Sequence, residues 1–136
     1  MTLVERRCGY LLAGRLKRFT ANQTMRTLIR LLKPIRGAAK TLTLDNGSEF
    51  AEHEHMAKVL DLATYYFCDP YCSGQLGTNE NTNGLLRQYY PKGTNFAKLS
   101  QTHINRVVEQ LNNRPRKRLG YLTPAGLFWG EYSGAL

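Results

Sequence analysis

Two short segments with strand patterns and a helical segment between them limit most strongly what this chain can fold into. Lys40–Leu44 alternates weakly in polarity and runs into the tight turn Asp45-Asn46-Gly47, whereas Ala63–Cys68 is a continuous apolar run typical of a buried strand. Between them, Ser48 is suited to cap a helix that reaches about Asp61. Strands joined through a helix are typical of α/β folds, so a sheet covered by helices is expected.

The residues before these segments predict two more strands and a helix. Thr2–Leu16 has the pattern of two short strands that meet at Cys8-Gly9. Thr20 is a suitable N-cap for the helix that follows, and Pro34 closes that helix. Strands at the start and helices between the later strands predict an α/β domain with a mixed sheet.

Helices dominate the predicted C-terminal half. Thr78 can cap a helix that reaches about Tyr90, and Ser100 caps the clearest helix of the chain. Residues Thr123-Pro124 have the pattern of a further helix start. No repeat, low-complexity stretch or internal boundary divides the sequence, so residues 1–136 are expected to form a single domain. The apolar face of the clearest helix consists of Ile104, Val107, Val108 and Leu111.

The charge of the chain is strongly positive and unevenly distributed. The formal net charge is +9, and eight Lys or Arg residues lie between Leu85 and Gly120 against Glu109 alone. Such a basic region usually meets a polyanion, most often nucleic acid, and the alternative is a solvated surface that aids solubility.

The sequence contains neither a signal peptide pattern nor a membrane-length apolar run, and its three cysteines cannot all pair. A cytoplasmic location and no membrane partner are therefore expected.

Two carboxylates stand where chemistry is expected in such a fold. Asp45 ends a predicted strand, and sites in open α/β sheets form beyond the carboxyl ends of strands, although for this residue taken alone an Asp-Asn-Gly turn is the better explanation. Glu80 lies in the first turn of a predicted helix, and Arg87 follows seven residues later on the same face. That face would present a carboxylate to a metal ion and a guanidinium to a phosphate, although such spacing also arises by chance.

Four linked segments of the chain carry a family resemblance. In order they are LDNGSEFAEHEHMAKVL, YYFCDPY, GTNENTNGLLRQYYPKGTNF and LNNRPRKRLGYLTPAGLF. They resemble the catalytic core of the insertion sequence 30 family of transposases, which belongs with the DDE transposases and retroviral-type integrases. The similarity covers nearly the whole chain.

The resemblance implies a ribonuclease-H-like mixed sheet with flanking helices and a DNA cleavage and strand-transfer activity. In that family two Asp and one Glu bind two Mg²⁺ ions, for which Mn²⁺ can substitute. Asp45 matches the second Asp and Glu80 the Glu, with 34 residues between them. Arg87 matches a basic residue that steers a phosphate. Asn46 and Asn83 would hold the substrate or orient the groups around the metal ligands, with simple helix-surface polarity as the alternative for Asn83.

The resemblance also implies DNA as the partner, both at the ends of an insertion element and at a target site. A second copy of the chain, or an intact transposase, is the implied protein partner. The N-terminal DNA-recognition region of the family has no counterpart in this sequence. The remaining residues expected to contact DNA are Lys92, Arg114, Arg116, Lys117 and Arg118.

The sequence departs from the family pattern in two places. No residue of the chain matches the first Asp or the central strand that carries it, and the loop Tyr71–Gly77 lacks the family's Pro-Trp and Arg. A truncated and inactive core is therefore expected. The alternatives are a non-catalytic basic fragment that binds DNA or a transposase, and a small basic ribosomal-type or toxin-type protein, which the motifs oppose.

Overall fold

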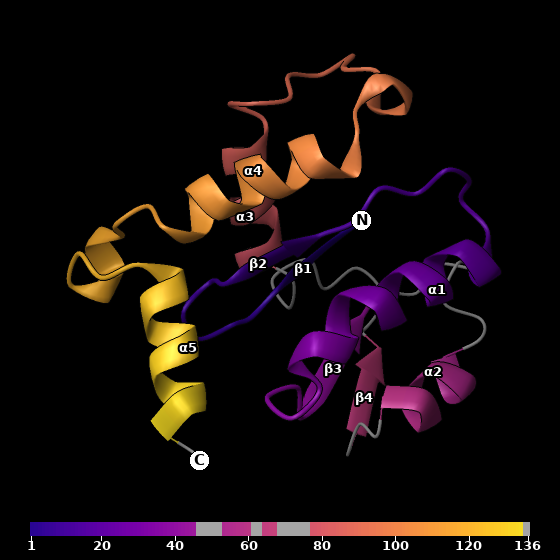
Figure 1. Ribbon diagram of the computed structural model, residues 1–136, viewed down its shortest axis with the longest axis horizontal. Coiled ribbons are helices and arrows are strands. Elements are labelled where there is room, and N and C mark those ends of the chain that lie inside the picture. The colour runs from indigo at the N-terminus through magenta and orange to yellow at the C-terminus, as the bar shows by residue number, and fades with distance from the viewer. Residues whose placement is uncertain (46–52, 61–63, 68–76, 135–136) are drawn as a thin grey trace. The chain divides into compact units, whose positions relative to one another are not determined.

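The chain folds into two compact units. The computed structural model describes residues 1–45, 53–60, 64–67 and 77–134 (Figure 1). One unit comprises Met1 and Gly14–Leu76, and the other comprises Thr2–Ala13 and Gly77–Leu136. Each unit combines short strands with helices, which is the α/β class predicted from the sequence.

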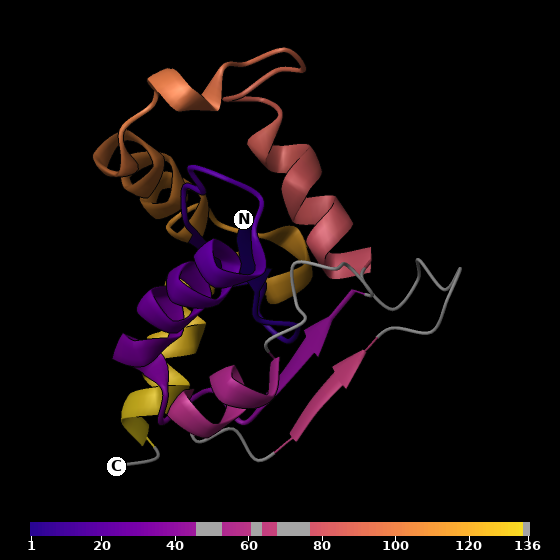
Figure 2. The ribbon, with the colours of Figure 1, turned by 90° about the vertical axis from the view of Figure 1, so that its right-hand side faces the viewer.

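The first unit contains a parallel strand pair. It consists of α1 (Ala21–Leu32), the 3-10 helix η1 (Lys33–Ile35), β3 (Thr41–Leu44), α2 (His53–Leu60) and β4 (Thr64–Phe67). Strands β3 and β4 run in the same direction, with Thr41 opposite Thr64 and Leu44 opposite Phe67 (Figure 2). Parallel neighbours need a crossover connection, and α2 lies in that connection.

Helix α1 begins where the sequence predicts. The Thr20 hydroxyl accepts a hydrogen bond from the backbone N–H of Gln23 at 3.2 Å, which satisfies one of the unpaired donors of the first turn. Leu28 and Leu32 on the inner face are buried, and α1 packs against α2, whose Met56 and Leu60 are also buried. Burial of each such side chain stabilises the fold by about 1.5–3 kcal/mol.

The second unit is built on a β-hairpin. Strands β1 (Thr2–Val4) and β2 (Leu11–Ala13) pair antiparallel, with Leu3 opposite Leu12. The predicted turn at Cys8-Gly9 is confirmed, and Gly9 has a φ of +76°, which favours glycine. Five helical elements of the described residues complete the unit: α3 (Gly77–Leu86), the 3-10 helix η4 (Phe96–Lys98), α4 (Gln101–Asn112), the 3-10 helix η5 (Lys117–Leu119) and α5 (Pro124–Gly134).

The core of the second unit lies between the hairpin and α4. Helix α4 packs against β2, and α3 packs against β1. The predicted cap of α4 is confirmed, because the Ser100 hydroxyl accepts from the backbone N–H of His103 at 3.1 Å. The predicted apolar face of α4 is buried at Ile104, Val107 and Leu111. The cluster at its centre is formed by Leu11, Tyr90, Val107 and Leu111.

Two expectations from the sequence need refinement. The helix expected to reach Tyr90 ends at Leu86, and the chain continues to Tyr90 as turns in which Tyr89 and Tyr90 donate to the Leu86 carbonyl. Among the described residues, the strands form two separate two-stranded sheets, one antiparallel and one parallel, in place of a single continuous mixed sheet.

None of the helices in the described ranges has the length and apolar character needed to cross a bilayer.

Candidate metal and DNA-binding residues

Asp45 lies directly after β3, at the strand end where the sequence predicts a functional carboxylate. The residue is exposed, and the pairing of Leu44 with Phe67 brings the carboxyl ends of β3 and β4 together. This edge of a parallel sheet is where ligands bind in open α/β folds. The neighbouring candidate, Asn46, lies outside the described residues.

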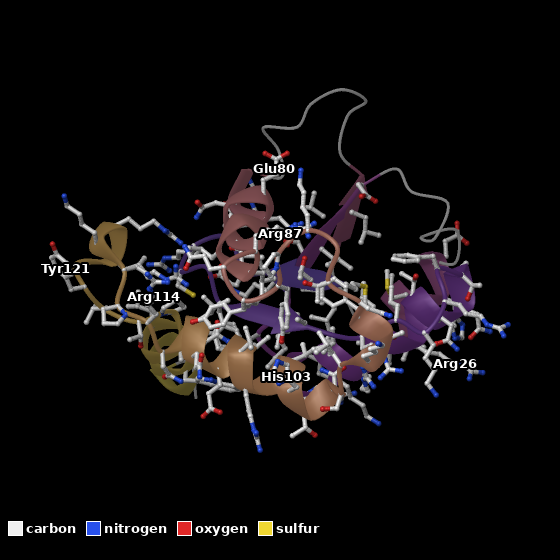
Figure 3. All side chains as sticks on the ribbon, turned by 90° about the horizontal axis from the view of Figure 1, so that it is seen from above. Arg26, Glu80, Arg87, His103, Arg114 and Tyr121 are labelled. Carbon is white, nitrogen blue, oxygen red and sulfur yellow. The ribbon has the colours of Figure 1, made fainter. Side chains whose placement is uncertain are left out.

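Glu80 lies in the first turn of α3 and is exposed. Gly84 and Arg87 are also exposed, so the face that the sequence predicts from a seven-residue spacing is open to solvent (Figure 3). A carboxylate near a helix N-terminus is stabilised by the helix dipole. The absence of a side chain at Gly84 leaves room between the carboxylate and the guanidinium, because no atom other than those of its chain neighbours and of the helix's own backbone would lie within 4 Å of a Cβ at this position.

The side of α3 next to this face is tied to the hairpin. The Thr2 hydroxyl lies 3.0 Å from Oδ1 of Asn83 and 3.3 Å from Oδ1 of Asn79, and it can donate its single proton to one of them at a time. Asn83 therefore has a structural contact that the sequence did not reveal. Its role in holding substrate stays a prediction. In that role the side-chain NH₂ group would donate to the substrate, because Oδ1 faces the Thr2 hydroxyl.

The basic segment after α4 is organised by hydrogen bonds to uncharged acceptors. Arg114 donates to the side-chain oxygen of Gln88 at 3.3 Å, Arg116 to the Leu111 carbonyl at 3.0 Å, and Arg118 to the Arg7 carbonyl at 3.2 Å. These bonds orient the guanidinium groups without neutralising their charge. The remaining cations predicted to contact DNA, Lys92 and Lys117, are both exposed.

The loop that carries these cations is closed on itself. The backbone N–H of Arg116 donates to the Leu122 carbonyl at 3.0 Å, and that of Tyr121 donates to the Arg116 carbonyl at 2.8 Å. Gly120 and Tyr121 both have a positive φ, of 63° and 65°, which is uncommon for a residue with a bulky side chain. Tyr121 is 69% exposed and projects outward from this loop (Figure 3).

Arg116 experiences the charge of its neighbours. Its side chain is half-buried, and burial is the main cause that lowers the pKa of its guanidinium. The positive charges of Arg114 and Arg118 lower the pKa of Arg116 further. Three like charges held near one another in this way favour the approach of an anion.

The two candidate metal ligands belong to different units. Asp45 lies in the unit of Gly14–Leu76, and Glu80 lies in the unit of Gly77–Leu136. Within the described ranges, no three His, Cys, Asp or Glu side chains are grouped so that they could hold a metal ion. A metal site shared by Asp45 and Glu80 therefore stays a prediction.

Comparison with known proteins relates most of this sequence to transposases. It is 53% identical over 93 residues to the transposase for insertion sequence element IS4351 of Bacteroides fragilis, a match that covers 68% of this chain and 28% of the relative. It is 43% identical over 127 residues to the transposase InsI for insertion sequence element IS30A of Escherichia coli (strain K12), which covers 90% of this chain and 32% of the relative. By sequence, this chain belongs to the insertion sequence 30 family of transposases.

The chain spans about a third of the length of the curated transposases it matches. A relative at 36% identity over 130 residues, the probable transposase for insertion-like sequence element IS1161 of Streptococcus salivarius, covers 94% of this chain and 36% of its own length. These relatives confirm the family resemblance seen in the four sequence segments. No family model matches the chain.

A solved structure supports the fold of this transposase-family chain. A cryo-electron microscopy structure of the simian T-cell lymphotropic virus intasome in complex with PP2A regulatory subunit B56 gamma contains a chain that is similar with a TM-score of 0.72. The sequences are 23% identical, and the likeness covers 93% of this chain and 46% of the viral chain. The fold is therefore ribonuclease-H-like, as the family resemblance implied.

Proposed function

We propose that this chain is part of the core of a DNA transposase and binds DNA through its second unit. The observation that carries the proposal is the exposed face of α3, where Glu80 in the first turn is followed by Arg87 two turns later. Because the chain belongs to the insertion sequence 30 family, we assign this carboxylate and this guanidinium to contact with DNA. Transposition requires contact with phosphodiester bonds, and a carboxylate and a guanidinium are the groups that hold a metal ion and a phosphate.

Asp45 and Glu80 are the residues of this chain that would hold Mg²⁺ or Mn²⁺. Both are exposed and both offer hard oxygen ligands, which fits these ions. When bound, two such ions activate an attacking hydroxyl and stabilise the leaving oxygen of a phosphodiester. Arg87 would orient the phosphate from the same face of α3, and the cations at Lys92 and Arg114–Arg118 would hold the DNA backbone.

For residues 1–136 taken alone, we propose DNA binding without cleavage. The first Asp of the family pattern has no match in these residues, and two carboxylates hold a pair of metal ions less firmly than three. In this proposal the chain acts as a non-catalytic module that engages DNA or an intact transposase, which is the alternative function given by the sequence. We propose that it acts in the cytoplasm, because bacterial DNA lies there.

Metal binding can be tested without an activity assay. Mn²⁺ broadens the NMR signals of nuclei close to it, so titration should broaden the amide signals around Asp45 and Glu80 selectively. Asp45→Asn and Glu80→Gln should each reduce this broadening. Glu109→Gln is a matched control, because Glu109 is an exposed carboxylate on α4 outside the proposed site. Equal broadening at Glu109 and Glu80 would refute the metal site.

The proposed inactivity is tested by incubating the chain with element-end DNA and Mg²⁺ or Mn²⁺. On a native gel we expect the DNA to migrate more slowly because the chain binds it, and on a denaturing gel we expect the DNA strands to keep their full length. Cleavage that is lost in Glu80→Gln would show that residues 1–136 are a working enzyme.

A further inference from the structure

A pocket of ≈ 550 Å³ lies within the second unit. Its walls are the Cys8-Gly9 turn, one face of α3 between Gly77 and Leu85, and the segment Arg114–Arg118. Small-ligand sites in proteins have volumes of about 300–1,000 Å³. The pocket is therefore large enough for a nucleotide-sized group, although Glu80 and Arg87 are not part of its lining.

The lining of this pocket carries positive charge that its own residues do not balance. No carboxylate of the described residues lines it. The acidic residue nearest in sequence to the turn, Glu5, accepts hydrogen bonds from the backbone N–H groups of Arg7 and Cys8, at 2.8 and 2.7 Å, and from the Cys8 thiol at 2.8 Å. Its carboxylate is therefore engaged within its own turn. The cations of the lining are Arg114, Arg116, Lys117 and Arg118.

The turn at Gly9 is shaped around one of these cations. A Cβ at Gly9 would lie 2.7 Å from Nη2 of Arg118, and its φ of +76° disfavours any side chain. Glycine therefore lets the Arg118 guanidinium rest against the turn, where it donates to the Arg7 carbonyl. A cation fixed before the ligand arrives loses little conformational entropy on binding, which raises affinity.

Polar groups of α3 complete the lining of the pocket. Gly77 and Thr78 belong to the first turn of this helix, where backbone N–H groups have no acceptor within the helix and attract anions. Asn81 adds a side-chain amide to the lining. Thr82 is buried and donates its hydroxyl proton to the Thr78 carbonyl at 2.9 Å, which holds this wall in place.

The composition of the lining indicates which part of a nucleic acid fits. Among the described residues, no aromatic side chain lines the pocket, so it offers no platform on which a base would stack. Clustered guanidinium groups and helix N-terminal amides bind phosphate oxygens instead. We infer that this pocket binds a phosphodiester group of the DNA backbone, an assignment that rests on the proposed function in DNA binding.

The first test measures DNA affinity of the full chain by fluorescence anisotropy at several salt concentrations. Each phosphate contact contributes about −0.9 to the slope of log affinity against log salt concentration. Arg118→Gln should weaken binding several-fold and make the slope shallower by about one such contact. Arg106→Gln is the matched control, because Arg106 is an exposed cation of α4 outside the pocket. Equal losses in both variants would overturn the assignment.

A second variant alters the pocket without changing its charge. Gly9→Ala places a methyl group where the Arg118 guanidinium lies, so it should weaken DNA binding while the net charge stays the same. Circular dichroism melting shows whether the variant folds. If it does not fold, the comparison of Arg118→Gln with Arg106→Gln decides the matter.

The third test uses inorganic phosphate as the probe. Titration should shift the NMR amide signals of Gly9, Thr78 and Asn81 in a saturable manner, and Arg118→Gln should abolish the saturation. Small uniform shifts would overturn the pocket as a phosphate site. If phosphate saturates the pocket but the chain does not bind DNA, the proposed function fails. If DNA binds and the pocket variants have no effect, the pocket assignment alone fails.

Discussion

The side chain of Asn112 pairs with the backbone of Leu11 as a neighbouring strand would. The Leu11 N–H donates to Oδ1 of Asn112 at 2.8 Å, and Nδ2 of Asn112 donates to the Leu11 carbonyl at 2.8 Å. Both residues are buried, at 4% and 1% exposed. Since a buried backbone donor and acceptor without partners are costly, this amide satisfies the outer edge of β2 and fixes α4 against it.

Asn112→Ala should therefore destabilise the protein strongly. The change leaves the N–H and the carbonyl of Leu11 buried without partners, which costs on the order of 2–3 kcal/mol. Urea unfolding followed by circular dichroism measures the loss. Asn113→Ala is the control, because Asn113 is exposed and makes one side-chain hydrogen bond, to the Glu109 carbonyl; it should cost about 0.5 kcal/mol or less. Equal losses would mean that the Asn112 pairing contributes little.

Leu111→Ala should show how much the core of the second unit contributes. Leu111 is 1% exposed and packs with Leu11, Tyr90 and Val107. Removing three carbons from such a site lowers the free energy of unfolding by about 2–5 kcal/mol, as lost burial and as a cavity. The same substitution at Leu122, which is 55% exposed, should change it by about 0.5 kcal/mol or less.

Cys8 should make stability depend on pH at the alkaline end. Burial, and then the hydrogen bond that its thiol donates to Glu5, raise the pKa of Cys8 from 9.0 to about 12. Because the folded pKa lies above the unfolded one, the stabilisation is fully present below pH 9 and is lost as the pH rises toward 12. Unfolding measured at pH 8 and pH 10.5 should show a larger loss for the natural chain than for Cys8→Ala.

Glu5 should show the opposite dependence at acidic pH. Burial of its carboxyl acts to raise the pKa, but hydrogen bonds from the Cys8 thiol and from the backbone N–H groups of Cys8 and Arg7 outweigh it, and the pKa of Glu5 is lowered. Stability from this group is therefore present above its ordinary pKa and is lost as the pH falls through the lowered value. Glu5→Gln should flatten the acid limb of a stability profile, and an unchanged limb would contradict the hydrogen-bonded turn.

Tyr10 and Phe128 should be energetically coupled. Their rings are stacked with centroids 4.3 Å apart and an angle of 7° between planes, which fixes α5 against the segment that precedes β2. Such pairs contribute about 0.5–1.5 kcal/mol beyond the area that they bury. A double-mutant cycle with Tyr10→Leu and Phe128→Leu should recover a coupling of this size. The pair Tyr10 and Leu122, whose side chain is 55% exposed, should give none.

The sequence by itself determined the local features of this protein. Thr20 and Ser100 cap their helices as predicted, because a cap depends on residues within one turn of it. The strands before Cys8-Gly9, before Asp45 and within Ala63–Cys68 are confirmed in their described parts for the same local reason. The candidate carboxylates followed from strand and helix ends together with the family motifs.

The tertiary structure alone decided the contacts between distant residues. Leu11 and Asn112 lie 101 positions apart, and Arg118 reaches the Arg7 carbonyl over 111 positions, so no periodicity or spacing could reveal either pairing. An asparagine at the end of an amphipathic helix looks like a surface residue in sequence. It is buried here because the edge strand of a short hairpin needs a partner for its backbone, and that need exists only once the helix and the hairpin have come together.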